Sequence, residues 1–278
     1  MLSRSELRSA RELYLNLTLR EVRGKYRRTV LGNLWSLLNP LAAMVIYTAV
    51  FSVLLRVQPD PGEPSGLDVF ALWLMTGLLA WNFLSAGVSQ GMSALVGNAG
   101  LLTKVYFPRW VLIASTVSAA GVTYAIELVA LSAVLLVFGA FVLPWLPGVV
   151  VVGLLLAVTA FGLGLALSVL NVYFRDTQHF VAIGLQVWFY LTPIVYPISL
   201  VQEAERRLAD DRGIDVPLQR LYELNPMTHF VSALRALMYD NRLPDAVDLV
   251  WCLGAAVVSL TVGVLVFRRF SARVVEEL

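Results

Sequence analysis

Six long apolar runs, separated by short polar breaks, limit what this 278-residue chain can fold into. A helix crosses a bilayer with about 20 apolar residues, and in lipid only helices and closed barrels satisfy every backbone polar group. Charged residues make up 14% of the chain, whereas a soluble domain carries about 25%. The sequence therefore predicts an all-α integral membrane protein with six transmembrane helices, over residues 33–55, 69–93, 111–138, 149–170, 180–198 and 247–267.

The distribution of Lys and Arg predicts which side of the membrane each polar segment faces. Six spans place both termini on one side, together with the breaks at 98–109 and 171–179, and these segments carry 14 of the 21 basic residues. Because basic residues favour the cytoplasmic side, both termini are expected in the cytoplasm, as in a multi-pass bacterial inner-membrane protein. Residues 1–32 then form a cytoplasmic segment, and residues 33–278 form the membrane domain.

Residues 3–28 have the pattern of a basic amphipathic helix. Arginines recur at helical spacing, and leucines supply a broad apolar face. Such a helix lies in the membrane interface, with its leucines among acyl chains and its arginines among phosphates. The charges also set topology, and the two interpretations are compatible. A sharper hypothesis is that four cations meet an anionic lipid substrate, namely Arg23, Lys25, Arg27 and Arg28.

The break at 98–109 is a short polar segment between two long apolar runs. Asn98 can cap a short helix, and Pro108 must end it because proline lacks the backbone donor and disfavours a helical residue before it. We expect a helix of about two turns at the membrane surface, with Lys104 and Arg109 facing water. Either this is an ordinary cytoplasmic loop, or it receives force from a soluble partner.

The long loop 199–248 carries a second set of helical signals. Asn225 followed by Pro226 is a preferred start for a helix. The helix expected over 226–239 is too short to span, so we interpret it as re-entrant or interfacial. Residues 218–224 also have a helical pattern, and Pro193 and Pro197 stand at the end of the fifth apolar run.

The sequence offers no catalytic or metal-binding motif of its own. The Gly24-Lys25 pair lacks the upstream glycine of a phosphate-binding loop, and no His, Asp or Glu cluster suggests a metal. The two histidines, His179 and His229, are each expected to be hydrogen-bonded structural residues. The single cysteine, Cys252, excludes an intramolecular disulfide.

Two groups within the spans leave alternatives open. Glu127 lies inside the third apolar run, where a charge is expensive and marks a functional hypothesis. It either couples protons in a secondary transporter or is a hydrogen-bonded carboxyl that joins two helices. Aromatic residues of the first and fifth runs either face lipid or line a wide channel with flat rings for sugars. These are Tyr47, Phe51, Trp188 and Tyr190.

Four segments together resemble the permease subunit of ABC-2-type polysaccharide exporters, the family that exports O-antigen, teichoic acid or galactan. Each motif is weak alone, but the set is in the family's order and agrees with six spans. The segments are 23–35 with Asn39-Pro40, 98–109, 171–176 and 225–235.

The resemblance implies that the break is a coupling helix for a separate ATPase. A pair of copies of the chain would join a pair of ATPase subunits, which would bind ATP and Mg, whereas this chain would hold no cofactor and would not be an enzyme. No nucleic acid is implied. The coupling residues would be Asn98, Leu101, Leu102, Lys104, Val105, Tyr106, Phe107, Pro108 and Arg109.

The resemblance also implies a substrate and a path for it. The substrate would be a polysaccharide linked to a polyprenyl pyrophosphate, with Arg175 joining the four N-terminal cations at the pyrophosphate. The first and fifth spans would line the channel. Residues 199–245 would form periplasmic gate helices, with Pro193, Pro197, Asn225 and Pro226 at the gate. A lipid or drug exporter of the same general type remains the alternative within transport.

Overall fold

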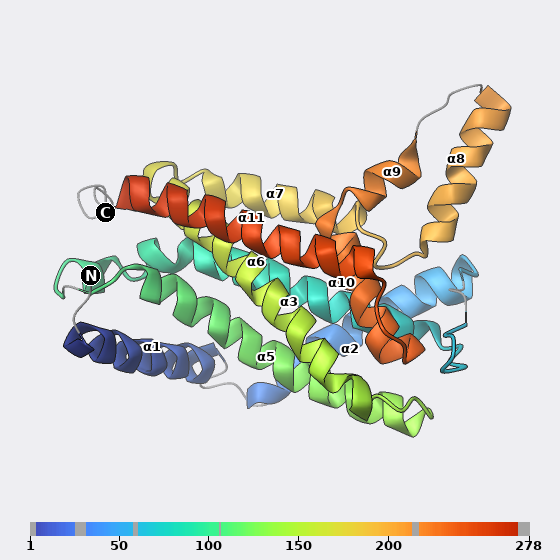
Figure 1. Ribbon diagram of the computed structural model, residues 1–278, viewed down its shortest axis with the longest axis horizontal. Helices are drawn as coiled ribbons and strands as arrows, with labels where there is room; N and C mark the ends of the chain where they lie inside the picture. The colour runs from blue at the N-terminus through green and yellow to red at the C-terminus, as the bar shows by residue number, and fades with distance from the viewer. Residues whose placement is uncertain (1–3, 26–31, 58–60, 106, 213–216, 272–278) are drawn as a thin grey trace.

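The computed structural model describes residues 4–25, 32–57, 61–105, 107–212 and 217–271, and every regular element in these ranges is a helix (Figure 1). The α-helices are α1 (Arg4–Lys25), α2 (Trp35–Tyr47), α3 (Phe70–Gly97), α4 (Ala99–Leu102), α5 (Trp110–Val137), α6 (Leu146–Tyr173), α7 (Thr177–Tyr190), α8 (Ile198–Arg212), α9 (Leu218–Glu223), α10 (Pro226–Arg235) and α11 (Ala246–Phe270). Short 3-10 or π-helical pieces adjoin them: η1 (Gly32–Leu34), η2 (Thr48–Leu54), η3 (Leu143–Trp145) and η4 (Ala236–Asp240). The all-α expectation is confirmed.

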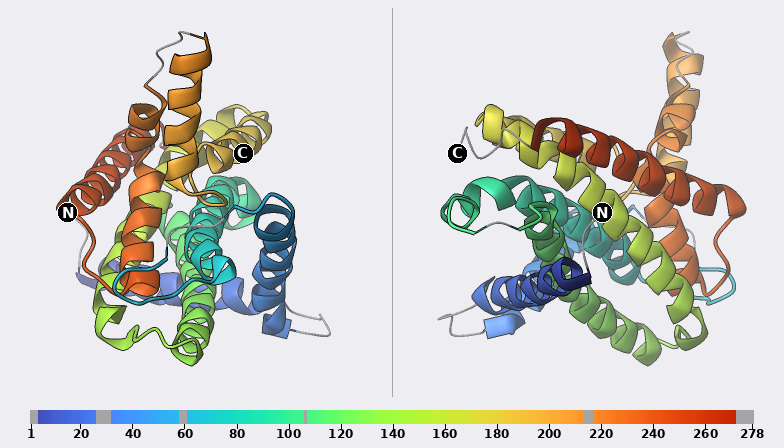
Figure 2. Two further views of the ribbon diagram at one scale, coloured as in Figure 1. Left: turned by 90° about the vertical axis from the view of Figure 1, so that its right-hand side faces the viewer. Right: turned by 60° about the vertical axis from the view of Figure 1, so that its left-hand side comes forward.

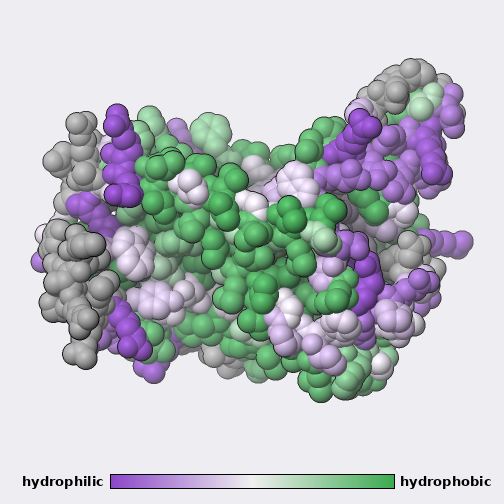
Figure 3. Space-filling model, in the orientation of Figure 1, coloured by the Kyte–Doolittle hydropathy of each residue, from purple (hydrophilic) through white to green (hydrophobic). Residues whose placement is uncertain are grey.

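Within the described ranges, five helices are long and apolar enough to cross a membrane. Figure 3 shows the matching surface, with hydrophobic residues over the middle of the molecule and hydrophilic residues toward both ends. Such a belt is what the bilayer requires of a protein that crosses it. The spans are Leu37–Leu54, Phe70–Gly97, Trp110–Val137, Leu143–Tyr173 and Ala246–Phe270.

The expected continuous span over 180–198 is wrong. The helix α7 has 14 residues and ends at Tyr190, and the next residues form turns as far as Pro197. Pro193 and Pro197 cannot continue a helix, because each lacks the backbone donor and its ring meets the preceding turn. The apolar segment from Leu191 to Ile194 instead folds back and is largely buried against the rest of the protein.

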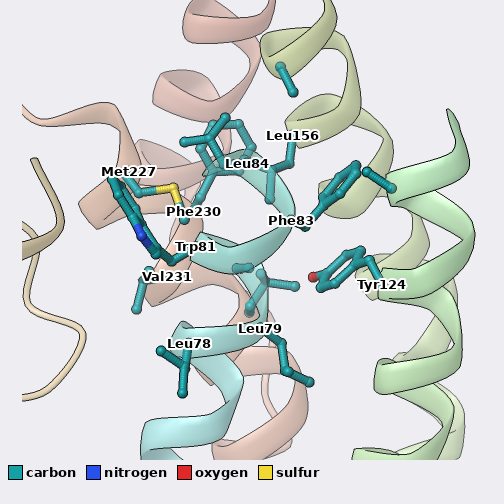
Figure 4. Packing of buried hydrophobic residues seen from close by; sticks show 14 of the residues in the cluster. Leu78, Leu79, Trp81, Phe83, Leu84, Tyr124, Leu156, Met227, Phe230 and Val231 are labelled. Atoms are coloured by element: carbon teal, nitrogen blue, oxygen red, sulfur yellow. The ribbon is translucent and has the colours of Figure 1, made fainter. Parts of the chain in front are cut away.

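The helix α3 is the centre of the bundle, because 78% of its most apolar 18-residue stretch is buried. It packs against α5 and α6, and Figure 4 shows Phe83 facing Tyr124 of α5, with ring centroids 4.8 Å apart and planes at 5°. On another side of α3, a Cβ on Gly91 would stand 3.3 Å from the Cα of Gly164 in α6. Small residues permit such close approach in membrane bundles. The GxxxG spacing of Gly87 and Gly91 predicts packing on protein, and both glycines are buried.

The N-terminal helix α1 forms as expected and lies against α5 (Figures 1 and 2). The hydroxyl groups of Tyr14 and Ser118 are 2.6 Å apart, and Leu17 is buried. The side chains of Leu15 and Leu19 are exposed, on the other side of the helix. The apolar face is therefore divided between protein contact and exposed surface, which a lipid interface would cover.

The helices expected in the long loop are also present. The helix α10 begins at Pro226 and continues through η4, and α9 precedes it. The helix α10 packs against α3, α6 and α11 with most of its side chains buried, so it is held by protein. In both views of Figure 2, and in Figure 1, α8 projects away from the bundle.

Candidate functional site

The helices α2, α3 and α7 enclose a groove with a volume of about 460 Å³. It is lined by four aromatic, four polar and four aliphatic side chains. A groove of this size and mixed character is suited to a ligand rather than to packing. Its lining residues are Ala43, Tyr47, Leu78, Trp81, Asn82, Ser85, Ser89, Ala182, Leu185, Gln186, Phe189 and Tyr190.

Aromatic rings form one part of the groove. The ring of Phe189 lies 6.2 Å from that of Tyr47, 5.6 Å from that of Trp81 and 5.2 Å from that of Tyr190, measured between centroids. These contacts join α2, α3 and α7 through one aromatic cluster. Tyr190 is 54% exposed, so its ring is available to a ligand. Flat apolar faces with polar edges suit the faces and hydroxyls of sugar rings.

Polar side chains of α3 form another part. Asn82, Ser85 and Ser89 are spaced three and four residues apart, so they share one face of the helix. Gln186 of α7 lines the same groove. Among the described residues, these four side chains have no hydrogen-bond partner, and they can therefore bond to a ligand. Aromatic rings that can stack on sugar rings, and amide and hydroxyl groups that can bond to sugar hydroxyls, are the two kinds of contact that bind a carbohydrate.

Our sequence reasoning missed this polar face. The spacing of Gly87 and Gly91 indicates that the second half of the 69–93 run packs on protein, and that is true of the glycine face. The side chains of Asn82, Ser85 and Ser89 point to a different side. Their helical spacing was the signal that could have separated the two faces.

The structure separates the four predicted channel residues. Tyr47 and Tyr190 line the groove, whereas Phe51 lies one helical turn beyond Tyr47, 6.3 Å from its ring, and does not line it. Trp188 contacts Trp81 edge-on at 5.7 Å, and its indole N–H donates to Asn225 Oδ1 at 2.8 Å. Trp188 therefore links α7 to α10 and is not a lining residue.

The helix in the break at 98–109 is shorter than expected. The helix α4 makes one turn over Ala99–Leu102, and the two-turn expectation is wrong because the chain turns at Thr103 and Lys104. Asn98 does not cap α4. Its amide donates to the Ala94 carbonyl at 2.9 Å, which closes the end of α3, and its Oδ1 accepts from Arg20 of α1 at 2.7 Å.

The residues predicted to couple to an ATPase form a mixed basic and apolar surface. Lys104 and Val105 are exposed, Leu101 is half-buried, and Leu102 is buried against the core. Phe107, Pro108 and Arg109 are half-buried, and Tyr106 lies outside the described residues.

The structure describes the side chains of two of the five predicted cations. Arg23 and Arg175 are exposed. The side chain of Lys25, and Arg27 and Arg28 entirely, lie outside what the structure describes. The break connects α3 to α5. In Figures 1 and 2 it lies with α1 on one side and the α6–α7 turn, which carries Arg175, on the other. In one copy of the chain, the break therefore separates α1, which carries Arg23, from the α6–α7 turn, which carries Arg175.

Asn225 is the cap that the sequence predicted. Its Oδ1 accepts from the Met227 backbone at 3.0 Å, and its amide donates to the Leu191 carbonyl at 3.1 Å and to Thr192 Oγ1 at 2.9 Å. With the bond from Trp188, this one side chain joins the end of α7 to the start of α10. Pro226 occupies the first helical position.

Arg235 holds the turn that follows α7. Its guanidinium donates to the carbonyls of Pro193 and Ile194, each at 2.8 Å, and lies 3.4 Å from the centroid of the Trp73 ring. Burial lowers the pKa of Arg235 to about 9, and nearby Asp240 acts in the opposite direction. No sequence pattern distinguishes this arginine from the other charged residues of the loop. Pro197 is buried at the start of α8.

His229 is hydrogen-bonded through both ring nitrogens, as expected. Its Nδ1 lies 2.7 Å from Asp248 Oδ1, its Nε2 lies 2.7 Å from the Glu223 carbonyl, and its ring stacks on Trp251 at 5.1 Å. Burial lowers the pKa of His229, but the bonds to Asp248 and to the Glu223 carbonyl outweigh it and raise the pKa above its usual value. His229 therefore joins α9, α10 and α11 best when it is charged.

We expect the contribution of His229 to be lost as the pH rises. A raised folded-state pKa adds stability that is complete below the unfolded pKa of about 6.5 and disappears as the pH passes the folded pKa. The melting temperature of His229→Gln should therefore fall furthest below that of the parent protein at pH 6, and the gap should narrow at pH 9. His179→Gln, at an exposed histidine, is the control. An equal gap at both pH values would contradict a charged His229.

Comparison with known proteins places these features in a family. The family described as ABC-2 type transporter matches residues 12–239 of the chain. The chain belongs to this family. It is 33% identical over 270 residues to the O-antigen export system permease protein RfbA of Myxococcus xanthus, which covers 95% of this chain and 94% of that protein.

Further relatives have similar names. An O-antigen export system permease protein RfbA of Klebsiella pneumoniae is 26% identical over 267 residues, covering 95% of this chain and 94% of that protein. The polysialic acid transport protein KpsM of Escherichia coli is 23% identical over 256 residues, covering 91% of each. As an ABC-2 type membrane subunit, the chain is a transport protein and not an enzyme, and the family implies a separate ABC ATPase as its partner. The family resemblance inferred from the four segments is confirmed.

Proposed function

We propose that this chain is the transmembrane permease of an ATP-driven exporter that moves a lipid-linked polysaccharide out of the cytoplasm. The lipid is a polyprenyl pyrophosphate, and the glycan is of the O-antigen, galactan or teichoic-acid type. The chain itself holds no cofactor, and ATP and Mg bind to the partner. The proposal places both termini in the cytoplasm and the protein in the bacterial inner membrane.

The groove between α2, α3 and α7 is the observation that carries the proposal. An exporter of drugs or lipids needs a narrow apolar cavity, whereas this groove combines four aromatic rings with amide and hydroxyl groups. The named relatives export polysaccharides, and the lining chemistry agrees with such a cargo. The family match gives no support to a proton-coupled transporter that would use Glu127.

The open shape of the groove supports a homodimer of the chain. Only 6% of the membrane-spanning stretch Leu37–Leu54, which contains most of α2, is buried. In a single copy, the α2 wall of the groove therefore has few protein contacts. A second copy would supply the missing enclosure, as expected of a symmetric homodimer. A wide path for a glycan then lies between the copies.

The connection between the break and the groove suggests the mechanism. The break follows α3 directly, and α3 carries Asn82, Ser85 and Ser89. When the ATPase subunits close on ATP, they press on the break and move the cytoplasmic ends of α3 and α5. The displaced α3 changes the groove, and the glycan advances while the lipid chain stays in the bilayer.

Charge reversal at the break tests the coupling to the ATPase. We expect Lys104→Glu with Arg109→Glu to reduce recovery of the cognate ATPase on the purified permease by at least about tenfold, because a docking surface would turn from basic to acidic. The measurement is co-purification followed by ATPase activity. Arg220→Glu, at an exposed site on α9, should leave recovery unchanged. If no ATPase binds to the unmodified chain, the proposed function is wrong.

Removal of one polar group from the groove tests the cargo. We expect Asn82→Leu to reduce glycan export several-fold while the ATPase still binds, because one hydrogen bond contributes about 0.5–1.5 kcal/mol. Gln90→Leu is the matched control, since Gln90 is exposed on the same helix outside the groove. Export is followed as surface glycan in cells that lack the native permease. Equal glycan export by the two variants would show that this face of α3 does not contact the glycan.

A further inference from the structure

A second cavity lies beside the groove and has a different chemistry. The helices α2, α3 and α5 enclose a pocket of about 250 Å³, whose exposed lining is almost wholly apolar. Leu41 and Met44 of α2 face Met75 and Leu79 of α3, and Ala130 lies on the α5 side. Glu127 is part of the wall but is buried, so the surface offered to a ligand is hydrocarbon.

The groove and the apolar pocket meet at the contact between α2 and α3. Adjacent residues of each helix face different cavities: Ala43 faces the groove and Met44 faces the pocket, and Leu78 and Leu79 are divided in the same way. The helix α2 therefore borders both cavities, and its contact with α3 separates the cavity with polar and aromatic groups from the cavity for hydrocarbon. Its low burial agrees with this position.

We propose that the apolar pocket binds a segment of the isoprenoid chain of the lipid-linked glycan, and this rests on the proposed function. Only a ligand that has both a glycan and a hydrocarbon chain can make favourable contacts in both cavities at once. An acyl chain of bulk lipid has no part that belongs in the groove. Aliphatic residues with two adaptable methionines fit an irregular branched chain, and the contact is dispersion rather than hydrogen bonding.

The pocket also has a role in the transport cycle. A chain held beside α2 keeps its headgroup near the groove, so the glycan is presented to Trp81 and Asn82 at a high local concentration. The lipid part remains at the membrane side of α2 while the glycan moves.

Photocrosslinking with two probes tests this inference in the complete complex with its ATPase. The complex is placed in bilayers of phosphatidylethanolamine and phosphatidylglycerol, with either a diazirine-bearing polyprenyl phosphate or a diazirine-bearing phosphatidylcholine. We expect the polyprenyl probe to label peptides 37–44 and 127–138, and an excess of unlabelled polyprenyl phosphate to reduce that label at least fivefold. Equal labelling of these peptides by the phospholipid probe, with no competition by polyprenyl phosphate, would overturn the inference.

A pair of adjacent variants locates the label. Ala130→Trp fills the pocket and should reduce polyprenyl labelling at least fivefold. Val129→Trp places the same bulk on a side chain that is 71% exposed and should leave it unchanged. The competition experiment on the unmodified protein decides the matter even if Ala130→Trp fails to fold. If the complex forms and exports glycan but the pocket is not labelled, the pocket inference fails and the proposed function stands.

Discussion

Gly162→Ala is expected to destabilise the protein by about 1–3 kcal/mol or more, since it overpacks a contact that cannot yield. A Cβ on Gly162 would fall onto the backbone of Ser259 and Leu260 in α11, and a Cβ on Gly263 would fall onto the backbone of Gly162. Backbone atoms within helices cannot rotate away as a side chain can. The two helices must separate, and the small-residue contact that lets them approach is lost. The measurement is the melting temperature in detergent.

Gly153→Ala is the matched control on the same helix. Its new methyl group would stand 3.6 Å from the Tyr124 ring, which is an ordinary contact. We expect this variant to melt within about 1 °C of the parent and to bind the ATPase normally, because surface-like substitutions usually change stability by less than about 0.5 kcal/mol. Similar melting temperatures for the two alanine variants would mean that α6 and α11 are not packed so closely.

Arg235→Met should have the second large effect. It removes the donors to the carbonyls of Pro193 and Ile194 and the cation above Trp73. Each unsatisfied carbonyl costs about 1–3 kcal/mol, and the loss of the cation–π contact costs about 0.5–2 kcal/mol. Release of a half-buried charge offsets part of this. We expect a net loss of about 2–4 kcal/mol, and the turn after α7 should become sensitive to protease.

Arg235→Lys and Arg242→Met complete the experiment. Lysine keeps the charge but lacks the planar fork that reaches two carbonyls together, so it should recover less than half of the lost stability. Arg242 is exposed and forms ion pairs with Asp240 and Asp245, and exposed pairs contribute at most about 1 kcal/mol. Full recovery by lysine would show that charge, and not the fork geometry, holds the turn.

The features that could be predicted from sequence depend on single runs of residues. Apolar runs longer than 20 residues became α3, α5, α6 and α11, because length and composition alone satisfy the membrane. The start of α10 followed from Asn225 and Pro226, because capping is local. The cap expected at Asn98 failed because its amide is used by α3 and its oxygen by Arg20.

The features that could not be predicted depend on contacts between distant segments. The run at 180–198 is apolar throughout, and composition does not distinguish a span from a short helix with a buried turn. That turn is stable because Arg235, some forty residues later, bonds to its carbonyls. The groove likewise forms only because α2 and α7 leave one face of α3 uncovered. The sequence of α3 alone does not determine where those two helices lie.

The weak packing of α2 has a consequence for how such a protein changes over evolutionary time. A substitution in a closely packed helix such as α3 must be matched by changes in its neighbours, which slows divergence. The groove face of α2 is under much less of this constraint, because little of the helix is buried. On the proposed function, new glycan specificity would therefore arise from a few changes on α2, without loss of the fold.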